Sequence, residues 1–341
     1  MVDRVLLAAP RGFCAGVEMA IKSLAWMVRT YEPPVYCYHE IVHNQLVVDR
    51  FRALGVVFVD SIDDVPAGAP LMLSAHGSAP EVVAAGRARA GFLVNAVCPL
   101  VTKVHHEAKV RAGRGYQIVY VGHRGHDEAV GALAVAPQSM HLVESAEDLS
   151  ELAGHDGPVA LLAQTTLAQQ EWGGVLAAAQ HRWPDLWTAG RSDLCFATTN
   201  RQAALIEIAR RSDVVVVIGS ANSSNTLALA KVATAAGAAH VLRIDDPDEL
   251  PADLAGVVAV TAGASAPDEL VRAVIARLAP RDGVEEVHVT SEDEYFPLPR
   301  ELRDLLGAIE ALIAHMSGAA VVKLPADRSL PASDVLESLR T

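Results

Sequence analysis

Three cysteines in similar settings are the residues of this chain best suited to chemistry. Cys14, Cys98 and Cys195 each follow a short apolar segment and directly precede a helical pattern. Structural zinc usually takes four protein ligands, often as local cysteine pairs, and no CxxC pair occurs in this sequence. Three thiolates suit an iron–sulfur cluster in which one iron keeps an open position where chemistry can take place. The fourth cysteine, Cys37, lies inside the apolar segment PVYCY, so we expect it to be a core residue.

The segments after the three cysteines share one plan of helix, strand, polar turn, helix, strand and polar turn. The first turns carry a polar residue 29, 28 and 28 residues after the respective cysteine, namely His43, His126 and Ser223. The second turns also carry a polar residue each, at 62, 67 and 70 residues after the respective cysteine: His76, Thr165 and Ser265. We interpret these offsets as an internal repeat.

Short β-branched strands that alternate with amphipathic helices predict parallel-rich sheets with helices on both faces. In such sheets ligands bind at the carboxyl ends of the strands, which is where all the polar turns fall. We therefore expect an α/β fold of three similar lobes in a pseudo-threefold arrangement around a central iron–sulfur cluster. The expected boundaries are 1–96 with Cys14, 97–194 with Cys98 and 195–303 with Cys195, followed by a C-terminal segment, 304–341, made of an amphipathic helix and a loose tail.

The polar turns are rich in neutral hydrogen-bond donors and contain almost no Lys or Arg. These donors are His43, His76, His126, Thr165, Thr166, Ser223, Ser224, Asn225 and Ser265. Each by itself is ordinarily a helix cap or a loop residue, but as a set they can hold a multiply charged anion. Asn225 and Ser265 precede helical patterns, where free backbone N–H groups favour phosphate.

Glu128 stands two residues after His126 in one of these turns. Burial and a nearby negative charge raise the pKa of a carboxyl group, which suits it to deliver protons. The alternative interpretation is an acidic residue that stabilises a helix N-terminus. Thr165 in a neighbouring turn makes a proton relay the interpretation that we test.

Composition and charge exclude several other classes. The chain has 341 residues, 51% of them hydrophobic, which is enough for two or three domains. The net charge of −13 and the lack of long Lys/Arg runs argue against nucleic acid or an anionic membrane as a partner. Apolar runs are of strand length, far below the roughly 20 residues of a membrane span, and no signal-peptide pattern is present. We expect a cytoplasmic protein, where cysteines serve metal or redox chemistry in place of disulfides.

Ten ordered motifs resemble one known family. The motifs, which run from about residue 4 to 303, are PRGFCAGV, HEIVHNQ, SAHGSAP, CPLVTKVH, GHRGHDE, QTTL, LCFATTNRQ, SANSSN, TAGASAP and PLPRELR. Together they resemble the 4-hydroxy-3-methylbut-2-enyl diphosphate reductase (LytB) family of the non-mevalonate isoprenoid pathway. The resemblance implies a three-lobed α/β fold around a 4Fe–4S cluster, with Cys14, Cys98 and Cys195 on three irons and the substrate hydroxyl on the fourth.

The resemblance also implies roles for the polar turns. The residues that match the family's diphosphate cradle are His43, His76, His126, Ser223, Ser224, Asn225 and Ser265. Thr165 and Glu128, beside His126, match its hydroxyl-orienting and proton-delivering residues. The reaction would remove the hydroxyl as water with two electrons and two protons, yielding isopentenyl and dimethylallyl diphosphate. Ferredoxin or flavodoxin would supply the electrons one at a time.

Some positions depart from the family pattern. The family commonly has DATCP where this chain has NAVCP, with Asn95 and Val97, and often an Asp–Arg pair where it has Glu18–Met19. These changes leave open a paralogue that keeps the cluster but acts on another phosphorylated alcohol. A non-catalytic iron–sulfur or zinc sensor is a further alternative, against which Glu128, Thr165 and the anion cradle weigh, since sensing needs none of them.

Overall fold

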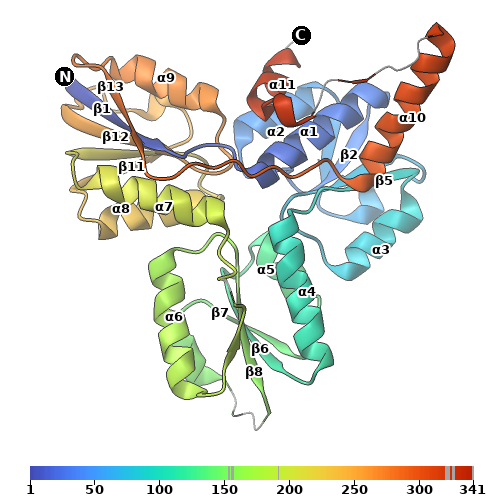
Figure 1. The fold of residues 1–341 in the computed structure, drawn as a ribbon, viewed down its shortest axis with the longest axis horizontal. Helices are drawn as coiled ribbons and strands as arrows, with labels where there is room; N and C mark the ends of the chain where they lie inside the picture. Colours follow the sequence, from blue (N-terminus) through green and yellow to red (C-terminus); the bar gives the residue numbers. More distant parts are fainter. Residues whose placement is uncertain (153, 155–156, 191, 319–322, 325–326, 340–341) are drawn as a thin grey trace. The chain divides into compact units, whose positions relative to one another are not determined.

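The computed structural model describes residues 1–341 except 153, 155–156, 191, 319–322, 325–326 and 340–341 (Figure 1). The chain forms two compact units, each assembled from separate stretches of sequence. Unit 1 comprises Met1–Cys14 and Pro99–Asp293, and unit 2 comprises Ala15–Cys98 and Glu294–Thr341.

Unit 1 contains a five-stranded parallel sheet in the order β11-β10-β12-β1-β13. Its strands are β1 (Val2–Ala9), β10 (Val214–Ile218), β11 (His240–Ile244), β12 (Gly256–Ala262) and β13 (Val284–His288). The connecting helices are α7 (Phe196–Ala209), α8 (Ser224–Ala235), the 3₁₀ turn η3 (Pro247–Glu249) and α9 (Asp268–Leu278). The apolar run of β10, and that of β12 with Thr261 as its one polar residue, are typical of parallel strands that are covered on both faces.

A second parallel sheet of unit 1 has the order β7-β6-β8-β9. Its strands are β6 (Gln117–Val121), β7 (Met140–Val143), β8 (Val159–Ala163) and β9 (Trp187–Thr188). Its helices are α4 (Pro99–Gly113), α5 (Asp127–Leu133), the 3₁₀ turn η2 (Glu147–Glu151) and α6 (Gln169–Arg182).

Unit 2 contains a four-stranded parallel sheet in the order β3-β2-β4-β5. Its strands are β2 (Val35–Tyr38), β3 (Val56–Val59), β4 (Pro70–Leu73) and β5 (Phe92–Asn95). Its helices and turns are α1 (Ala15–Thr30), α2 (Gln45–Ala53), η1 (Ile62–Asp64), α3 (Pro80–Arg89), α10 (Arg300–Ser317), η4 (Asp327–Ser329) and α11 (Ala332–Ser338).

Three parallel sheets connected by helices confirm the predicted α/β class. The strand that leads into Cys14, β1, pairs with β12 and β13, whereas the strand that leads into Cys98, β5, pairs with β4. The lobe boundaries that we expect from the sequence stay a prediction. Among the described residues no helix is long and apolar enough to cross a membrane.

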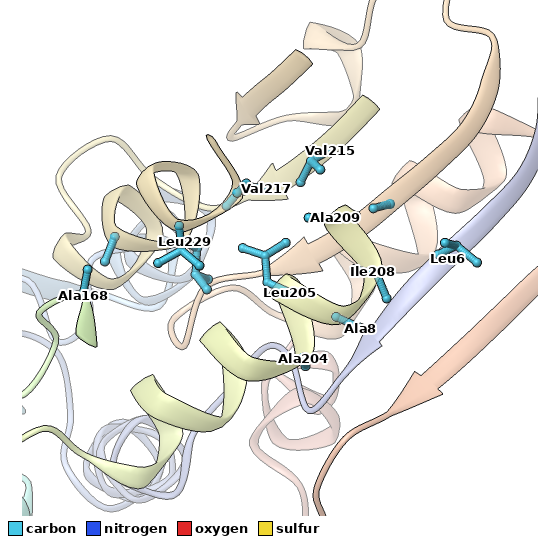
Figure 2. Packing of buried hydrophobic residues seen from close by; sticks show 14 residues of the cluster. Leu6, Ala8, Ala168, Ala204, Leu205, Ile208, Ala209, Val215, Val217 and Leu229 are labelled. Atoms are coloured by element: carbon cyan, nitrogen blue, oxygen red, sulfur yellow. The ribbon is translucent and has the colours of Figure 1, made fainter. Parts of the chain in front are cut away.

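A hydrophobic cluster packs the helices against the five-stranded sheet of unit 1 and reaches the turn after β8 (Figure 2). Leu205 and Ile208 of α7 pack in one cluster with Leu6 of β1 and Leu229 of α8. Ala168, which follows β8 in the other sheet, belongs to the same cluster. Because this cluster joins the turn after β8 to α7, the polar residues of that turn are positioned relative to the start of α7.

The C-terminal segment differs from the expected loose tail. The prediction of an amphipathic helix is confirmed by α10, but the residues after it include a second helix, α11, whose apolar side chains are buried: Ala332, Val335 and Leu336. The backbone N–H of Ala332 donates to Glu18 Oε2 at 2.8 Å, and Lys22 Nζ donates to the carbonyl of Asp327 at 3.2 Å. Glu18, one of the departures from the family pattern, thus binds the C-terminal segment. Residues 325–326 and 340–341 of the expected tail lie outside the described residues.

Candidate active site

Each of the three cysteines is fixed by one backbone hydrogen bond to a polar turn at the end of a strand. The N–H groups donate to carbonyl oxygens at 3.2, 3.0 and 3.1 Å in the pairs Cys14–Ala264, Cys98–Ala75 and Cys195–Thr165. These acceptors lie in the turns after β12, β4 and β8, respectively. They are the second polar turns of the repeat, which carry Ser265, His76 and Thr165.

The hydrogen bonds connect the repeats in a cycle. The second turn of the first repeat binds Cys98, that of the second repeat binds Cys195, and that of the third returns to Cys14. The same backbone contact therefore recurs three times, within unit 2 once and within unit 1 twice. This recurrence gives the internal repeat a structural basis beyond its spacing.

Cys14 and Cys195 form a thiol pair within unit 1. Burial raises the pKa of Cys195 to about 12, and the neighbouring thiol of Cys14 adds a smaller increase. The sulfur of Cys195 accepts the backbone N–H of Thr198 at 3.2 Å, and Thr198 Oγ1 lies 3.0 Å away. When a soft metal ion replaces the protons of two neighbouring thiols, its positive charge offsets the repulsion between the thiolates. Hydrogen bonds to the cysteine sulfurs are also a common feature of iron–sulfur sites. The donor set therefore fits a thiolate-bound cluster.

Cys37 takes no part in this arrangement. It lies in β2 with 0% exposure, and burial raises the pKa of its thiol. The expected core role of this cysteine is confirmed.

Arg201 anchors the turn that leads into Cys14, and sequence reasoning missed it. Its side chain is 1% exposed and donates to the carbonyls of Gly12 at 2.8 and 3.1 Å and of Phe13 at 3.2 Å. Its charge is balanced by Glu292, whose carboxylate oxygens lie 2.9 and 3.0 Å from Nη1. A signal for this role is the position of Arg201 on the helix that follows Cys195, within the motif LCFATTNRQ.

Glu128 and Thr165 form the expected pair. Glu128 is 3% exposed, its Oε1 accepts the backbone N–H of Thr165 at 2.7 Å, and its Oε2 accepts the Thr165 hydroxyl at 3.0 Å. Burial raises the pKa of Glu128 to about 7, with a smaller upward contribution from Asp193 and opposition from the Thr165 bonds. The expected direction of the pKa is confirmed. His126 caps α5, and its Nδ1 accepts the backbone N–H of Glu128 at 3.2 Å.

Asp193 is a second buried carboxyl that sequence reasoning missed. Its Oδ1 lies 3.3 Å from Lys103 Nζ and its Oδ2 accepts the backbone N–H of Ala163 at 3.2 Å. Burial raises the pKa of Asp193, and Lys103 opposes the increase. Asp193 therefore links α4 to the end of β8 and adds negative charge near Glu128.

The first turn of α8 contains an unsatisfied buried amide. The helix begins at Ser224 with Ser223 as its N-cap. Asn225 therefore lies inside the first turn, whereas we expected it to precede the helix. Asn225 is 4% exposed, and neither side-chain polar atom has a hydrogen-bond partner among the described residues. Because an unpartnered buried amide is costly, its position at a helix N-terminus indicates a binding site for an anionic ligand.

Two glycines allow strand ends to approach this helix closely. A Cβ at Gly219 would lie 2.5 Å from Thr226 Oγ1, and one at Gly263 would lie 2.3 Å from the same atom. Gly219 also has a φ of +144°, which side chains disfavour. The turns after β10 and β12 thus meet at the start of α8, and Ser265, which is 6% exposed, follows Gly263 by two residues.

Unit 2 brings together two of the predicted histidines. The rings of His43 and His76 stack with centroids 3.9 Å apart and an angle of 13° between their planes. Glu40 Oε2 lies 3.5 Å from His43 Nδ1. His76 follows Ala75, the residue whose carbonyl accepts the N–H of Cys98, so the histidine pair and this cysteine are fixed by the same turn.

Comparison with known proteins identifies the family. The family model described as LytB protein matches residues 5–279. The chain belongs to the LytB family. Two curated relatives named 4-hydroxy-3-methylbut-2-enyl diphosphate reductase, from Rhodopirellula baltica and Paracoccus denitrificans, are each 45% identical to it. The matches cover 88% and 87% of this chain and 96% of each relative.

Solved structures agree with the LytB assignment. The E-1-hydroxy-2-methyl-but-2-enyl-4-diphosphate reductase of Plasmodium falciparum superimposes with a TM-score of 0.87 at 28% sequence identity. The match covers 91% of this chain and the whole of that one. A second structure, of (E)-4-hydroxy-3-methyl-but-2-enyl diphosphate reductase, has a TM-score of 0.59 at 29% identity, with coverage of 82% and 99%.

Asn95 shows how this LytB chain accommodates one departure from the family pattern. Its Oδ1 accepts the backbone N–H of Val97 at 3.2 Å, one residue before Cys98. An aspartate can make the same turn-forming bond. The local geometry before the cysteine therefore does not depend on which of the two residues is present.

Proposed function

We propose that this chain is a 4-hydroxy-3-methylbut-2-enyl diphosphate reductase that yields isopentenyl and dimethylallyl diphosphate. The observation that carries the proposal is the Glu128–Thr165 pair, a carboxyl with a pKa near 7 bonded to a buried hydroxyl. Within the LytB family, whose relatives carry the name of this reductase, such a pair has a clear use as a proton source.

The three repeat cysteines, Cys14, Cys98 and Cys195, are the proposed ligands of a 4Fe–4S cluster. Such a cluster, when bound, supplies electrons and an open iron for the substrate hydroxyl. The hydrogen bond that the sulfur of Cys195 accepts from the backbone N–H of Thr198 supports this assignment, because such a bond stabilises the thiolate that binds iron. Ferredoxin or flavodoxin is the proposed electron donor.

The proposed diphosphate site uses neutral donors. Its residues are His43, His76, His126, Ser223, Ser224, Asn225 and Ser265. Asn225 supports the proposal most directly, since its amide is buried without a protein partner among the described residues. In this site neutral donors and a helix N-terminus would hold the diphosphate by hydrogen bonds, without a Lys or Arg side chain.

Proton delivery is assigned to Glu128 and Thr165. The reaction breaks the C–O bond of the allylic alcohol, consumes two electrons and two protons, and forms one C–H bond and one water molecule. At neutral pH a carboxyl with a pKa of about 7 is partly protonated and can give its proton to the departing hydroxyl through Thr165 Oγ1. Burial of this pair keeps competing water away.

The test is anaerobic purification with cluster reconstitution. We expect a brown protein with about four irons per chain, a spectrum that changes on addition of the allylic diphosphate, and reduction of that substrate with a chemical reductant. Colourless protein after reconstitution would contradict the proposal. Tight zinc binding without a spectral response to substrate would instead favour a sensor.

The departures at Glu18–Met19 and Val97 make a divergent paralogue the alternative to separate. A bacterial strain that lacks the reductase should grow when it expresses this chain. Failure of cluster-loaded, well-expressed protein to restore growth would favour the paralogue that acts on another phosphorylated alcohol.

A further inference from the structure

Three turns of unit 1 meet in a hydrogen-bond network around Ser224, the first residue of α8. The network includes Gln164 from the turn after β8 and His123 from the turn after β6. Gln164 is 0% exposed and Ser224 is 5% exposed. His123 and Gln164 follow strands of the four-stranded sheet, and Ser224 follows β10 of the five-stranded sheet, so the network joins the two sheets of unit 1.

The orientation of the Gln164 amide follows from its partners. The backbone N–H of His123 can only donate, and it lies 2.9 Å from Gln164 Oε1. Gln164 Nε2 must then face Ser224 Oγ at 2.9 Å and Thr166 Oγ1 at 2.8 Å, and it donates to both. Ser224 therefore accepts a hydrogen bond from Gln164 and keeps its own proton to donate.

The turn that carries His123 lies in close contact with this amide. A Cβ at Gly122 would lie 3.1 Å from Gln164 Oε1 and 2.8 Å from the ring of Tyr120. Glycine at this position allows the backbone N–H of the next residue to reach the amide. The backbone of His123 is thereby held against Gln164.

The His123 ring decides where the Ser224 proton points. His123 Nδ1 lies 3.1 Å from Ser224 Oγ. If Nδ1 carries no proton, it accepts the Ser224 O–H, and the hydroxyl has nothing left to donate to an anion. If Nδ1 carries the proton, it donates to Ser224 Oγ, and the Ser224 O–H is free for a ligand at the N-terminus of α8, beside the unsatisfied Asn225.

We infer that His123 is a positioning residue for the diphosphate, which with Gln164 makes two hydrogen bonds to Ser224 and so directs the Ser224 hydroxyl proton to the bound anion. The inference rests on the proposed function, which places the diphosphate at this helix start. It extends that function to a residue that does not itself touch the ligand. It also assigns the bound state one tautomer, with the proton on Nδ1.

The experiment compares two amide substitutions of His123 in the cluster-loaded protein. In His123→Asn the side-chain amide stands near the position of Nδ1 and can donate to Ser224, whereas in His123→Gln the amide reaches the position of Nε2. We expect His123→Gln to weaken inorganic pyrophosphate binding in calorimetry by roughly 10-fold or more, the effect of losing one hydrogen bond to a charged group. His123→Asn should restore most of the affinity. KM for the allylic diphosphate should rise with the pyrophosphate Kd while kcat changes little.

The same substitution in a Ser224→Ala variant, together with a matched control, separates this role from a structural one. In Ser224→Ala protein, changing His123 to Gln should add no further loss, because the residue acts through Ser224. The control is His141→Gln, since His141 is an exposed residue on β7, the edge strand of the same sheet, where its Nε2 pairs with the side-chain amide of Gln117 at 3.0 Å. This control should bind pyrophosphate as the unchanged protein does.

The outcomes distinguish the inference from the proposed function. Unchanged pyrophosphate affinity in His123→Gln, or an equal loss in the Ser224→Ala background, overturns the inference even if the enzyme reduces the allylic diphosphate. A His123-dependent pyrophosphate site in a protein that does not reduce this substrate upholds the inference and overturns the proposed reaction. A cluster-loaded protein that does not bind pyrophosphate at all overturns the anion site and the inference with it.

Discussion

The carboxylate of Glu128 binds both polar hydrogens of Thr165, the backbone N–H at 2.7 Å and the hydroxyl at 3.0 Å. The N–H can only donate, so Oε1 remains an acceptor and a proton on the carboxyl group belongs on Oε2. Protonated Oε2 then donates to Thr165 Oγ1, and the Thr165 hydroxyl proton is released toward a ligand. This geometry supports the proposed two-step relay.

Removing the acid while keeping its shape tests the first step of the relay. Glu128→Gln keeps an acceptor for the Thr165 N–H and a donor for its hydroxyl, but it has no acidic proton. We expect turnover to fall by roughly 10²–10⁴ while substrate still binds. Steady-state kinetics with parallel iron analysis measures this, because cluster loss would mimic the effect. Near-normal turnover of a fully loaded variant would remove Glu128 from the mechanism.

Thr165 is the proposed second step of the relay, and its side chain can be changed in two ways. Thr165→Val removes the hydroxyl at nearly constant shape, and we expect turnover to fall by roughly 10²-fold or more. Thr165→Ser keeps the hydroxyl and should retain most of the activity. If the two variants are equally active, protons reach the substrate by another route. As a control, substrate binding is monitored in each variant by the change in its absorption spectrum.

The pH dependence follows from the pKa of Glu128. Because this pKa is about 7, the acid form is lost as pH rises through 7, and kcat/KM should decline above this pH. Glu128→Gln should lack this decline in its residual activity. A wild-type profile that stays level from pH 6 to 9 contradicts the assignment.

Stability should change with the same group. The pKa of Glu128 is raised from 4.5, so the folded state binds a proton that the unfolded state releases at intermediate pH. Its contribution to the free energy of unfolding is complete below about pH 4.5 and is lost as pH rises through 7, by about 3 kcal/mol in total. Urea unfolding at pH 5 and pH 8 should therefore give a smaller difference for Glu128→Gln than for the unchanged protein.

Arg201 should be essential for the geometry of Cys14. Arg201→Met removes the charge partner of Glu292, which keeps only its hydrogen bond from Asn200 at 3.0 Å, and leaves the carbonyls of Gly12 and Phe13 without their donor, so we expect a loss of about 3–5 kcal/mol in unfolding free energy. Iron content should fall as well. Arg211→Met is the matched control, because Arg211 pairs with Glu285 at the surface and should contribute less than about 1 kcal/mol.

The four cysteines should divide into three ligands and one core residue. Serine at position 14, 98 or 195 should lower iron content after reconstitution, whereas Cys37→Ala should keep it and destabilise the fold by about 1 kcal/mol. Iron analysis and thermal unfolding measure the two effects. Loss of iron in Cys37→Ala at normal folding would contradict the division.

Patterns along the chain were sufficient for the α/β class, the repeat and the choice of Cys37 as a core residue. Strand and helix patterns depend on neighbouring residues, and the repeated offsets place similar turns at similar strand ends. The relation between Glu128 and Thr165 was also predictable, since both fall in such turns although they are 37 residues apart.

The tertiary structure alone decided which side chains fix these turns. Arg201 reaches Gly12 across 189 positions, and His123 reaches Ser224 across 101. Such contacts depend on how separate sheets pack, which no local period encodes. The C-terminal segment is a similar case, because α11 is a short helix that gains its stability from burial against the rest of unit 2 and from the bond to Glu18.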